Sequence, residues 1–164
     1  MELQQCWSHY LKADQLLEQG HWPEAHYLFE QVLTHLPEHI HSALNNQETK
    51  PCQFTCLVTG IRDAAVAQSQ ILNRMGQYEQ AFNTLNQTYA LLQFVSLEGS
   101  ELIRTIGSIL IKHCDDLLQH MAAFCSSQRN ARWMLELETL QKAHHHFDAL
   151  KQSYHGKQNT ALIN

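Results

Sequence analysis

The chain contains very few residues that interrupt regular secondary structure, and this scarcity limits the folds open to it. Among 164 residues there are only three prolines and six glycines. A protein built from many short strands needs a turn signal about every ten residues, which this chain does not supply. Apolar side chains instead recur at three- and four-residue steps through most of the sequence, the spacing of one helix face. We predict an all-α fold.

The first part of the chain shows two pairs of helical segments. Apolar residues repeat with helical spacing in four ranges, which are 3–17, 23–37, 54–75 and 78–92. Gly20 and Gly76 separate the two segments of each pair, because glycine readily takes the backbone angles at which helices end. Between the pairs, residues 38–53 lose the periodicity and are predicted to form a loop or a short helix.

The last third of the chain has longer periodic segments. One apolar stripe runs from Leu102 to Phe124, and the sequence SSQRN interrupts it. A second stripe runs from Trp133 to Tyr154 with a repeat of about 3.5 residues. We predict a long antiparallel helical pair over residues 100–155 and a frayed tail at 156–164. The whole chain, residues 1–164, is expected to form a single domain.

The first two pairs of segments resemble each other when Gly20 is aligned with Gly76. At that offset four further pairs coincide, which are Ala13 with Ser69, Leu16 with Leu72, Trp22 with Tyr78, and Ala25 with Ala81. Phe29 likewise falls opposite Leu85. This internal similarity predicts two copies of one helical hairpin.

The hairpin pattern resembles the tetratricopeptide repeat (TPR). In that family a small residue lies where two helices cross, a glycine closes the turn, and an aromatic residue and an alanine follow. The matching residues are Ala13, Gly20, Trp22, Ala25, Phe29 and the closing Pro37 in the first unit, and Gly76, Tyr78 and Ala81 in the second. A large side chain at either alanine would push the paired helices apart.

The resemblance implies a TPR-like α-α superhelix with two hairpins inside residues 5–93, at about 5–37 and 61–93. Consecutive units of the family lie about 34 residues apart, and Gly20 and Gly76 are separated by more than that, so residues 38–53 are interpreted as an insertion. Such arrays usually need about three units for stability. The C-terminal helices are therefore expected to cover the apolar face of the array, within the chain or through a homodimer.

The resemblance also implies a binding face, because the inner groove of such arrays is lined mainly by the first helix of each unit. The residues placed toward a partner are Trp7, Tyr10, Asp14 and Leu17 from the first unit, and Val66, Gln70 and Asn73 from the second. The alternative is that Trp7 and Tyr10 are buried by the C-terminal helices. The family's carboxylate clamp of Lys, Arg and Asn has no counterpart here, so recognition of chaperone tails is not expected.

Charge and cysteine usage exclude several classes of partner. The formal net charge is −5 and no basic stripe is present, so nucleic acid is not expected as a partner. The N-terminus lacks a secretion signal, and the most apolar run, 106–111, is far shorter than the roughly 20 residues of a membrane span. A cytoplasmic protein without membrane contact, with its five cysteines reduced, is expected.

Twelve histidines are the most unusual feature of the composition. His39 and His41 together with Cys52 and Cys56 could assemble a zinc site, but neither spacing requires a metal. We predict no metal site and no cofactor. Hydrolase, phosphate-loop and HExxH motifs are absent, so an enzyme is not expected.

These observations favour a protein-interaction module. We expect a cytoplasmic adaptor or chaperone that holds a segment of another protein, with a length and mild acidity similar to the TPR-type chaperones of bacterial type III secretion systems. The alternative is a homo-oligomeric sensor of a ligand, a metal or pH, in which the long C-terminal helices dimerise and the histidines titrate.

Overall fold

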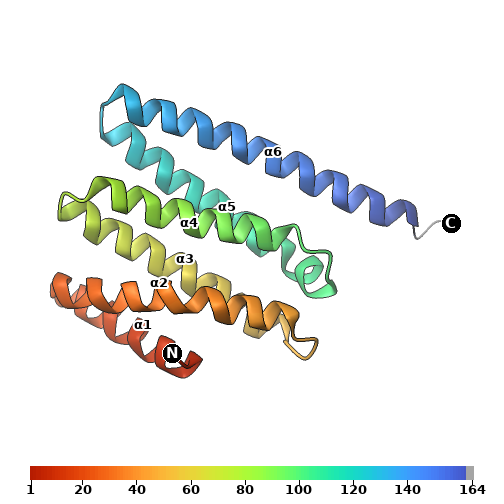
Figure 1. The fold of residues 1–164 in the computed structure, drawn as a ribbon, viewed down its shortest axis with the longest axis horizontal. Helices are drawn as coiled ribbons and strands as arrows, with labels where there is room; N and C mark the ends of the chain where they lie inside the picture. The colour runs from red at the N-terminus through yellow and green to blue at the C-terminus, as the bar shows by residue number, and fades with distance from the viewer. Residues whose placement is uncertain (162–164) are drawn as a thin grey trace. The chain divides into compact units, whose positions relative to one another are not determined.

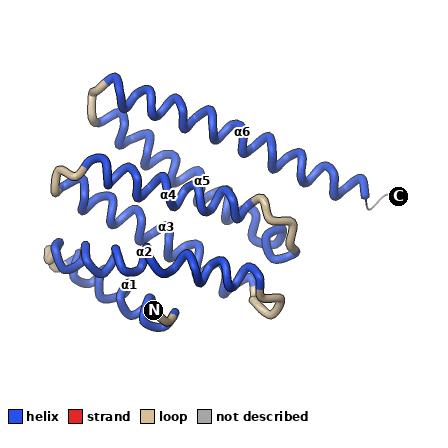
Figure 2. The backbone as a smooth tube through the Cα atoms, in the orientation of Figure 1, coloured by secondary structure: helices blue, strands red, loops and turns tan. Residues whose placement is uncertain are grey.

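The structure is a computed structural model that describes the backbone of residues 1–161 and the side chains of residues 1–153. Within these residues it contains no strand, and its helices are α1 (Leu3–Glu18), α2 (Trp22–Asn45), α3 (Pro51–Arg74), α4 (Tyr78–Ser96), α5 (Glu101–Ser127) and α6 (Ala131–Ala161). The all-α prediction is confirmed (Figure 1, Figure 2). No helix among residues 1–161 is both long and apolar enough to cross a membrane.

The chain divides into two compact units, Met1–Leu91 and Leu92–Asn164. The first contains α1, α2, α3 and most of α4, and the second contains the end of α4 with α5 and α6. Each unit is described separately below.

The first unit contains two turns of the same geometry. Gly20 and Gly76 have φ angles of 79° and 76°. The amide of Gly20 donates to Leu17, three residues back, and the next amide donates to Leu16, at 3.0 and 2.9 Å. Gly76 and its successor make the equivalent bonds, at 3.1 and 2.9 Å. Both turns are therefore Schellman motifs, which need a left-handed residue and so favour glycine.

Small residues lie inside the helix pairs that these turns connect. Ala13, Ala25 and Ala81 are completely buried, and Phe29 is buried among them in α2. The aromatic residues after the turns are more exposed. The Arg74 guanidinium lies 4.6 Å from the ring centroid of Trp22, a distance typical of a cation–π contact.

The structure corrects the expectation for residues 38–53. Helix α2 continues past Pro37 to Asn45, and α3 begins at Pro51, so the connection between them is short. The physical reason is burial: Leu36 and Ile40 are both fully buried and extend the apolar stripe of α2 beyond the proline. Pro37 therefore lies inside a helix and does not close the first hairpin, and the extra residues lengthen α2 and α3.

The second unit has its own apolar core. Ile106, Leu110, Leu117 and Met121 are buried along α5, and the Phe124 and Trp133 rings meet edge to face at 5.1 Å where α5 leads into α6. Phe94, at the end of α4, contacts Phe147 of α6 in the same manner at 5.7 Å. Edge-to-face pairs of this kind contribute about 0.5–1.5 kcal/mol beyond their burial.

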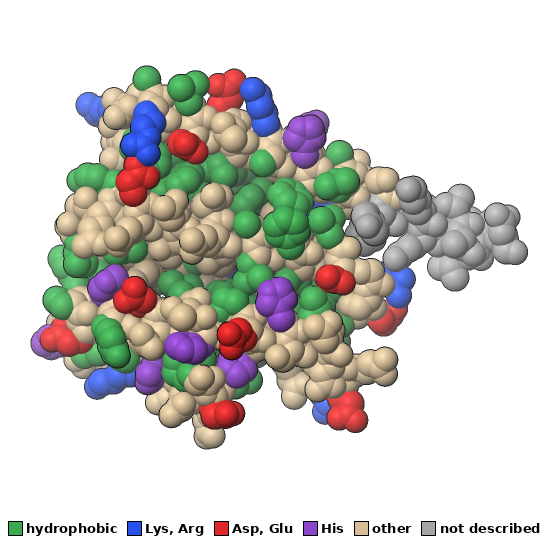
Figure 3. Space-filling view, viewed as in Figure 1, with side chains coloured by type: hydrophobic (Ala, Val, Ile, Leu, Met, Phe, Trp, Pro, Cys, Tyr) green, Lys and Arg blue, Asp and Glu red, His purple; other side chains and the backbone are tan. Residues whose placement is uncertain are grey.

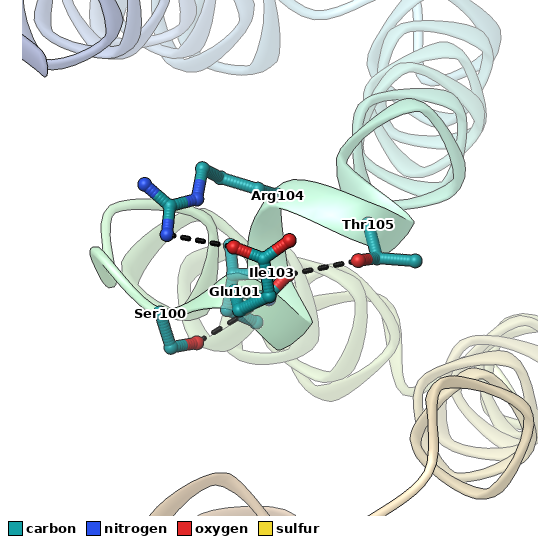
Figure 4. Close-up of polar contacts among 5 residues, drawn as sticks. All are labelled: Ser100, Glu101, Ile103, Arg104 and Thr105. Atoms are coloured by element: carbon teal, nitrogen blue, oxygen red, sulfur yellow. Dashed lines mark hydrogen bonds and ion pairs between the residues drawn. The ribbon is translucent and has the colours of Figure 1, made fainter. Parts of the chain in front are cut away.

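The start of α5 is held by local polar contacts (Figure 4). The Ser100 hydroxyl accepts a hydrogen bond from the Ile103 amide at 3.3 Å, which caps the helix. Arg104 pairs with Glu101 at 2.8 Å, and the Thr105 hydroxyl donates to the Glu101 carbonyl at 2.9 Å. The cap explains why α5 begins directly after this serine.

Helix α6 ends later than expected, at Ala161, so Gly156 does not stop it. A single glycine inside a helix costs only about 1 kcal/mol relative to alanine. Of the expected tail, residues 162–164 lie outside the described residues, as do the side chains from Tyr154 onward.

Candidate functional site

A groove of about 580 Å³ lies in the first unit between α2, α3 and α4. Leu33, Ile61 and Leu72 supply apolar surface to it. The α4 side is uncharged and mostly polar, and apart from Leu91 it consists of Gln80, Asn83, Thr84, Gln87 and Thr88. We call this feature the amide groove. Only one carboxylate, that of Glu30, is among its lining groups.

Gln68 of α3 is the most informative residue of the amide groove. It is only 3 % exposed, and its Nε2 lies 2.7 Å from Nδ1 of His26 on α2. The other amide atom, Oε1, has no hydrogen-bond partner. Turning the amide over would exchange the two atoms and leave the nitrogen unpaired, so one polar atom stays unsatisfied in either orientation.

An unsatisfied buried polar atom is unusual in a folded protein. Leaving such a group without a partner costs about 1–3 kcal/mol, and native structures contain only a few of them. Gln68 lines the groove but its free atom is buried, so a rotation of the side chain would let a bound molecule reach this atom and remove the cost. The glutamine therefore marks the amide groove as a candidate binding site.

The α2 side of the amide groove adds further acceptor groups. Proline has no backbone N–H, so Pro37 leaves the Leu33 carbonyl without its helical hydrogen bond, and both residues line the groove. The Thr34 hydroxyl donates to the Glu30 carbonyl at 2.8 Å, and the Thr84 hydroxyl donates to the Gln80 carbonyl at the same distance. Each hydroxyl keeps lone pairs available, so the groove offers several acceptors to a donor-bearing ligand.

Two of the residues predicted to face a partner, Trp7 and Tyr10, pack against other helices of the first unit. Trp7 packs on the α3 backbone at Gly60, where a Cβ would come within 2.5 Å of the indole. Tyr10 stands between the rings of Trp7 and Phe29, at centroid distances of 6.0 and 6.1 Å. Trp7 and Tyr10 thus join α1 to α2 and α3 within the first unit.

The Tyr10 hydroxyl is affected by the same packing. Burial raises the pKa of Tyr10 above its ordinary value, and the carboxylates of Asp63 and Asp14 raise it further, while Arg62 acts in the opposite direction. The phenol therefore stays uncharged to a higher pH than an ordinary tyrosine does.

The other predicted binding residues lie nearer to solvent. Leu17 and Gln70 share a small pocket of about 210 Å³ with Glu18 and Arg74. Asp14 and Asn73 are exposed, and Val66 is partly buried. Leu17 and Gln70 are the two predicted residues that the structure brings together in one pocket.

Sequence reasoning did not single out His26 or Gln68. The available signal was that Gln68 follows Ile61 and Ala64 on the stripe of α3 that is otherwise apolar and ends at Leu72. A polar residue on such a stripe either finds a partner or faces a ligand. Its histidine partner is 42 residues away in the chain, and no local pattern connects the two.

The histidines and cysteines whose side chains the structure describes do not converge on one point. Among the residues that the structure describes, no group of three or more His, Cys, Asp or Glu side chains could hold a metal ion. Cys52 and Cys56 are exposed, and the other cysteines are buried. In the second unit, Nε2 of His144 lies 3.3 Å from Asp115 and 3.5 Å from Asp148.

The face drawn in Figure 3 carries both acidic and basic side chains over its described part, and in several places the two kinds lie next to each other. Most of the remaining surface there belongs to uncharged polar groups, backbone and apolar side chains.

No family model matches the chain, and comparisons with curated proteins and with solved structures also give no match.

Proposed function

We propose that the chain is a protein-interaction module, an adaptor or chaperone that holds an extended segment of a partner protein in the amide groove. The observation that carries this proposal is the buried Gln68, a residue of the groove lining with one amide atom that lacks a hydrogen-bond partner. An extended peptide presents an N–H and a C=O at each residue and could satisfy that atom in either orientation.

The side chains of α4 suit a peptide as well. Gln80, Asn83, Thr84 and Gln87 follow one another at the three- and four-residue steps of a single helix face. This row is about 10 Å long at the helical rise of about 1.5 Å per residue. It matches about three residues of an extended chain, which advances about 3.3 Å per residue.

The proposal includes the finer architecture that the sequence resemblance implies. We infer that the hairpins α1–α2 and α3–α4 are two TPR-like units of a superhelix, with α5 and α6 as a long antiparallel pair. The matched turns at Gly20 and Gly76 support the first inference. A cytoplasmic location is consistent with the five free cysteines, because reduced thiols are typical of that compartment.

Peptide selection tests the proposal. Phage-displayed peptides of 12 residues would be enriched on the wild-type chain, and their affinities would be compared on two variants. Asn83→Arg places a bulky charge in the amide groove, whereas Gln70→Arg makes the same change on the exposed face predicted from sequence. We expect selected peptides to lose at least tenfold in affinity with Asn83→Arg and less than twofold with Gln70→Arg.

Two results would contradict the proposal. If no peptide is enriched over an unrelated helical protein, the groove does not bind extended segments. If Gln70→Arg abolishes binding and Asn83→Arg does not, the partner lies on the face of α1 and α3. Both changes are at exposed helix positions, so circular dichroism should show that both variants fold.

A further inference from the structure

The second unit contains a cavity that peptide binding in the first unit does not involve. Its volume is about 510 Å³, within the range of about 300–1,000 Å³ that small-molecule sites occupy. Ile103, Leu110 and Ile111 of α5 form an apolar wall. Asp148 and Lys151 of α6 contribute the charged groups. We call this feature the Lys151 pocket.

Lys151 is in an unusual position for a lysine. It is only 8 % exposed, and with the described residues it makes no hydrogen bond or ion pair. Asp148, one helical turn away, lies 3.5 Å from Nε2 of His144 instead. Lysines are almost never buried without a partner, because removing an ammonium group from water is unfavourable. An anion in the pocket would pair with this ammonium group.

Gly107 is a second, independent indication that this pocket binds a ligand. It lies in the middle of α5 and lines the Lys151 pocket, and a Cβ built there would meet nothing within 4 Å. Glycine in a helix interior costs about 1 kcal/mol relative to alanine. The glycine at position 60 has a packing reason, since the Trp7 ring lies against it. Gly107 has no such neighbour, and its effect is to keep the pocket open.

We propose that the Lys151 pocket binds a small organic monocarboxylate with an aliphatic body. The carboxylate would pair with the Lys151 ammonium, and the aliphatic part would lie along Leu110 and Ile111 over the space left by Gly107. Asp148 lines the same pocket, so a ligand with two negative charges would be repelled. A ligand with one negative charge and an apolar chain therefore complements the pocket walls.

Octanoate is a suitable probe, with octylammonium as the control of identical chain and opposite charge. Binding to the full-length protein would be measured by isothermal titration calorimetry below the micellar concentrations of both. We expect octanoate to bind at least tenfold more tightly than octylammonium. Lys151→Met should weaken octanoate binding at least tenfold, whereas Lys112→Met, at an exposed position of α5, should change it less than twofold.

If Lys151→Met does not fold, Gly107→Leu tests the same pocket in a second way. The leucine side chain would enter the open space of the pocket, so octanoate binding should be lost while the melting temperature is retained or raised. The proposal is overturned if the wild-type chain does not bind octanoate, or if octylammonium binds equally well. It is also overturned if octanoate binds folded Lys151→Met or Gly107→Leu as tightly as it binds the wild type.

Discussion

Gly60 and Gly107 both lie inside helices, but a side chain added at Gly60 would meet the Trp7 ring and one added at Gly107 would meet nothing. The same substitution at both positions therefore tests how closely Trp7 packs against α3. Gly60→Ala adds a methyl group 2.5 Å from the Trp7 indole, well inside van der Waals contact. Gly107→Ala adds the same group where nothing lies within 4 Å. Both residues are inside long helices, so the gain in helix propensity is the same, about 1 kcal/mol.

The expected free energies of unfolding follow from these distances. At Gly107 the propensity gain is unopposed, so the variant should be more stable by about 1 kcal/mol. At Gly60 the indole must move, and overpacking of this kind costs about 1–3 kcal/mol. The variant should therefore range from unchanged to less stable by about 2 kcal/mol, and the two substitutions should differ by about 1–3 kcal/mol.

Urea denaturation followed by circular dichroism, with hydrogen exchange of α3 and α5 amides to separate the two units, would measure the difference. A Trp7→Leu background provides the control, because removing the indole should let Gly60→Ala recover the propensity gain. Equal stabilisation by Gly60→Ala and Gly107→Ala in the wild-type background would refute the close approach of Trp7 to α3.

Three further predictions concern other sites. Ala81→Leu should destabilise the first unit by about 1–3 kcal/mol in a thermal melt, because Ala81 is completely buried; an unchanged melting temperature would contradict the close helix crossing. Pro37→Ala should stabilise α2 by restoring a helical hydrogen bond, worth up to about 3 kcal/mol, and should weaken peptide binding, which titration of a selected peptide would measure. Burial raises the pKa of the Cys114 thiol from 9.0 to about 12, and the unfolded thiol ionises first. The stability of the second unit should therefore fall by about 1 kcal/mol per pH unit between about 9 and 12. Urea melts of a Cys114→Ala variant should show a smaller fall, because burial also raises the pKa of Cys125, to about 11.

Local features of this protein could be predicted from its sequence because their causes are local. Gly20 and Gly76 permit the left-handed backbone of a helix end wherever they occur, and both have that conformation. The three- and four-residue spacing of apolar side chains likewise depends on helix geometry alone, and it placed every helix correctly in type. The end of α2 was predicted at Pro37, but the helix continues to Asn45. The burial of Leu36 and Ile40 offsets the cost of a proline inside the helix, and this burial depends on the tertiary structure.

Tertiary structure decided which polar and small residues have unusual surroundings. Gln68 and His26 meet only because α2 and α3 bring together residues 42 positions apart. Gly60 and Gly107 are the same residue in the same kind of helix, yet one contacts an indole and the other faces open space. Lys151 carries a charge, yet the packing around α6 buries it beside a cavity. Burial and pairing depend on which helix faces meet, and a linear pattern does not contain that information.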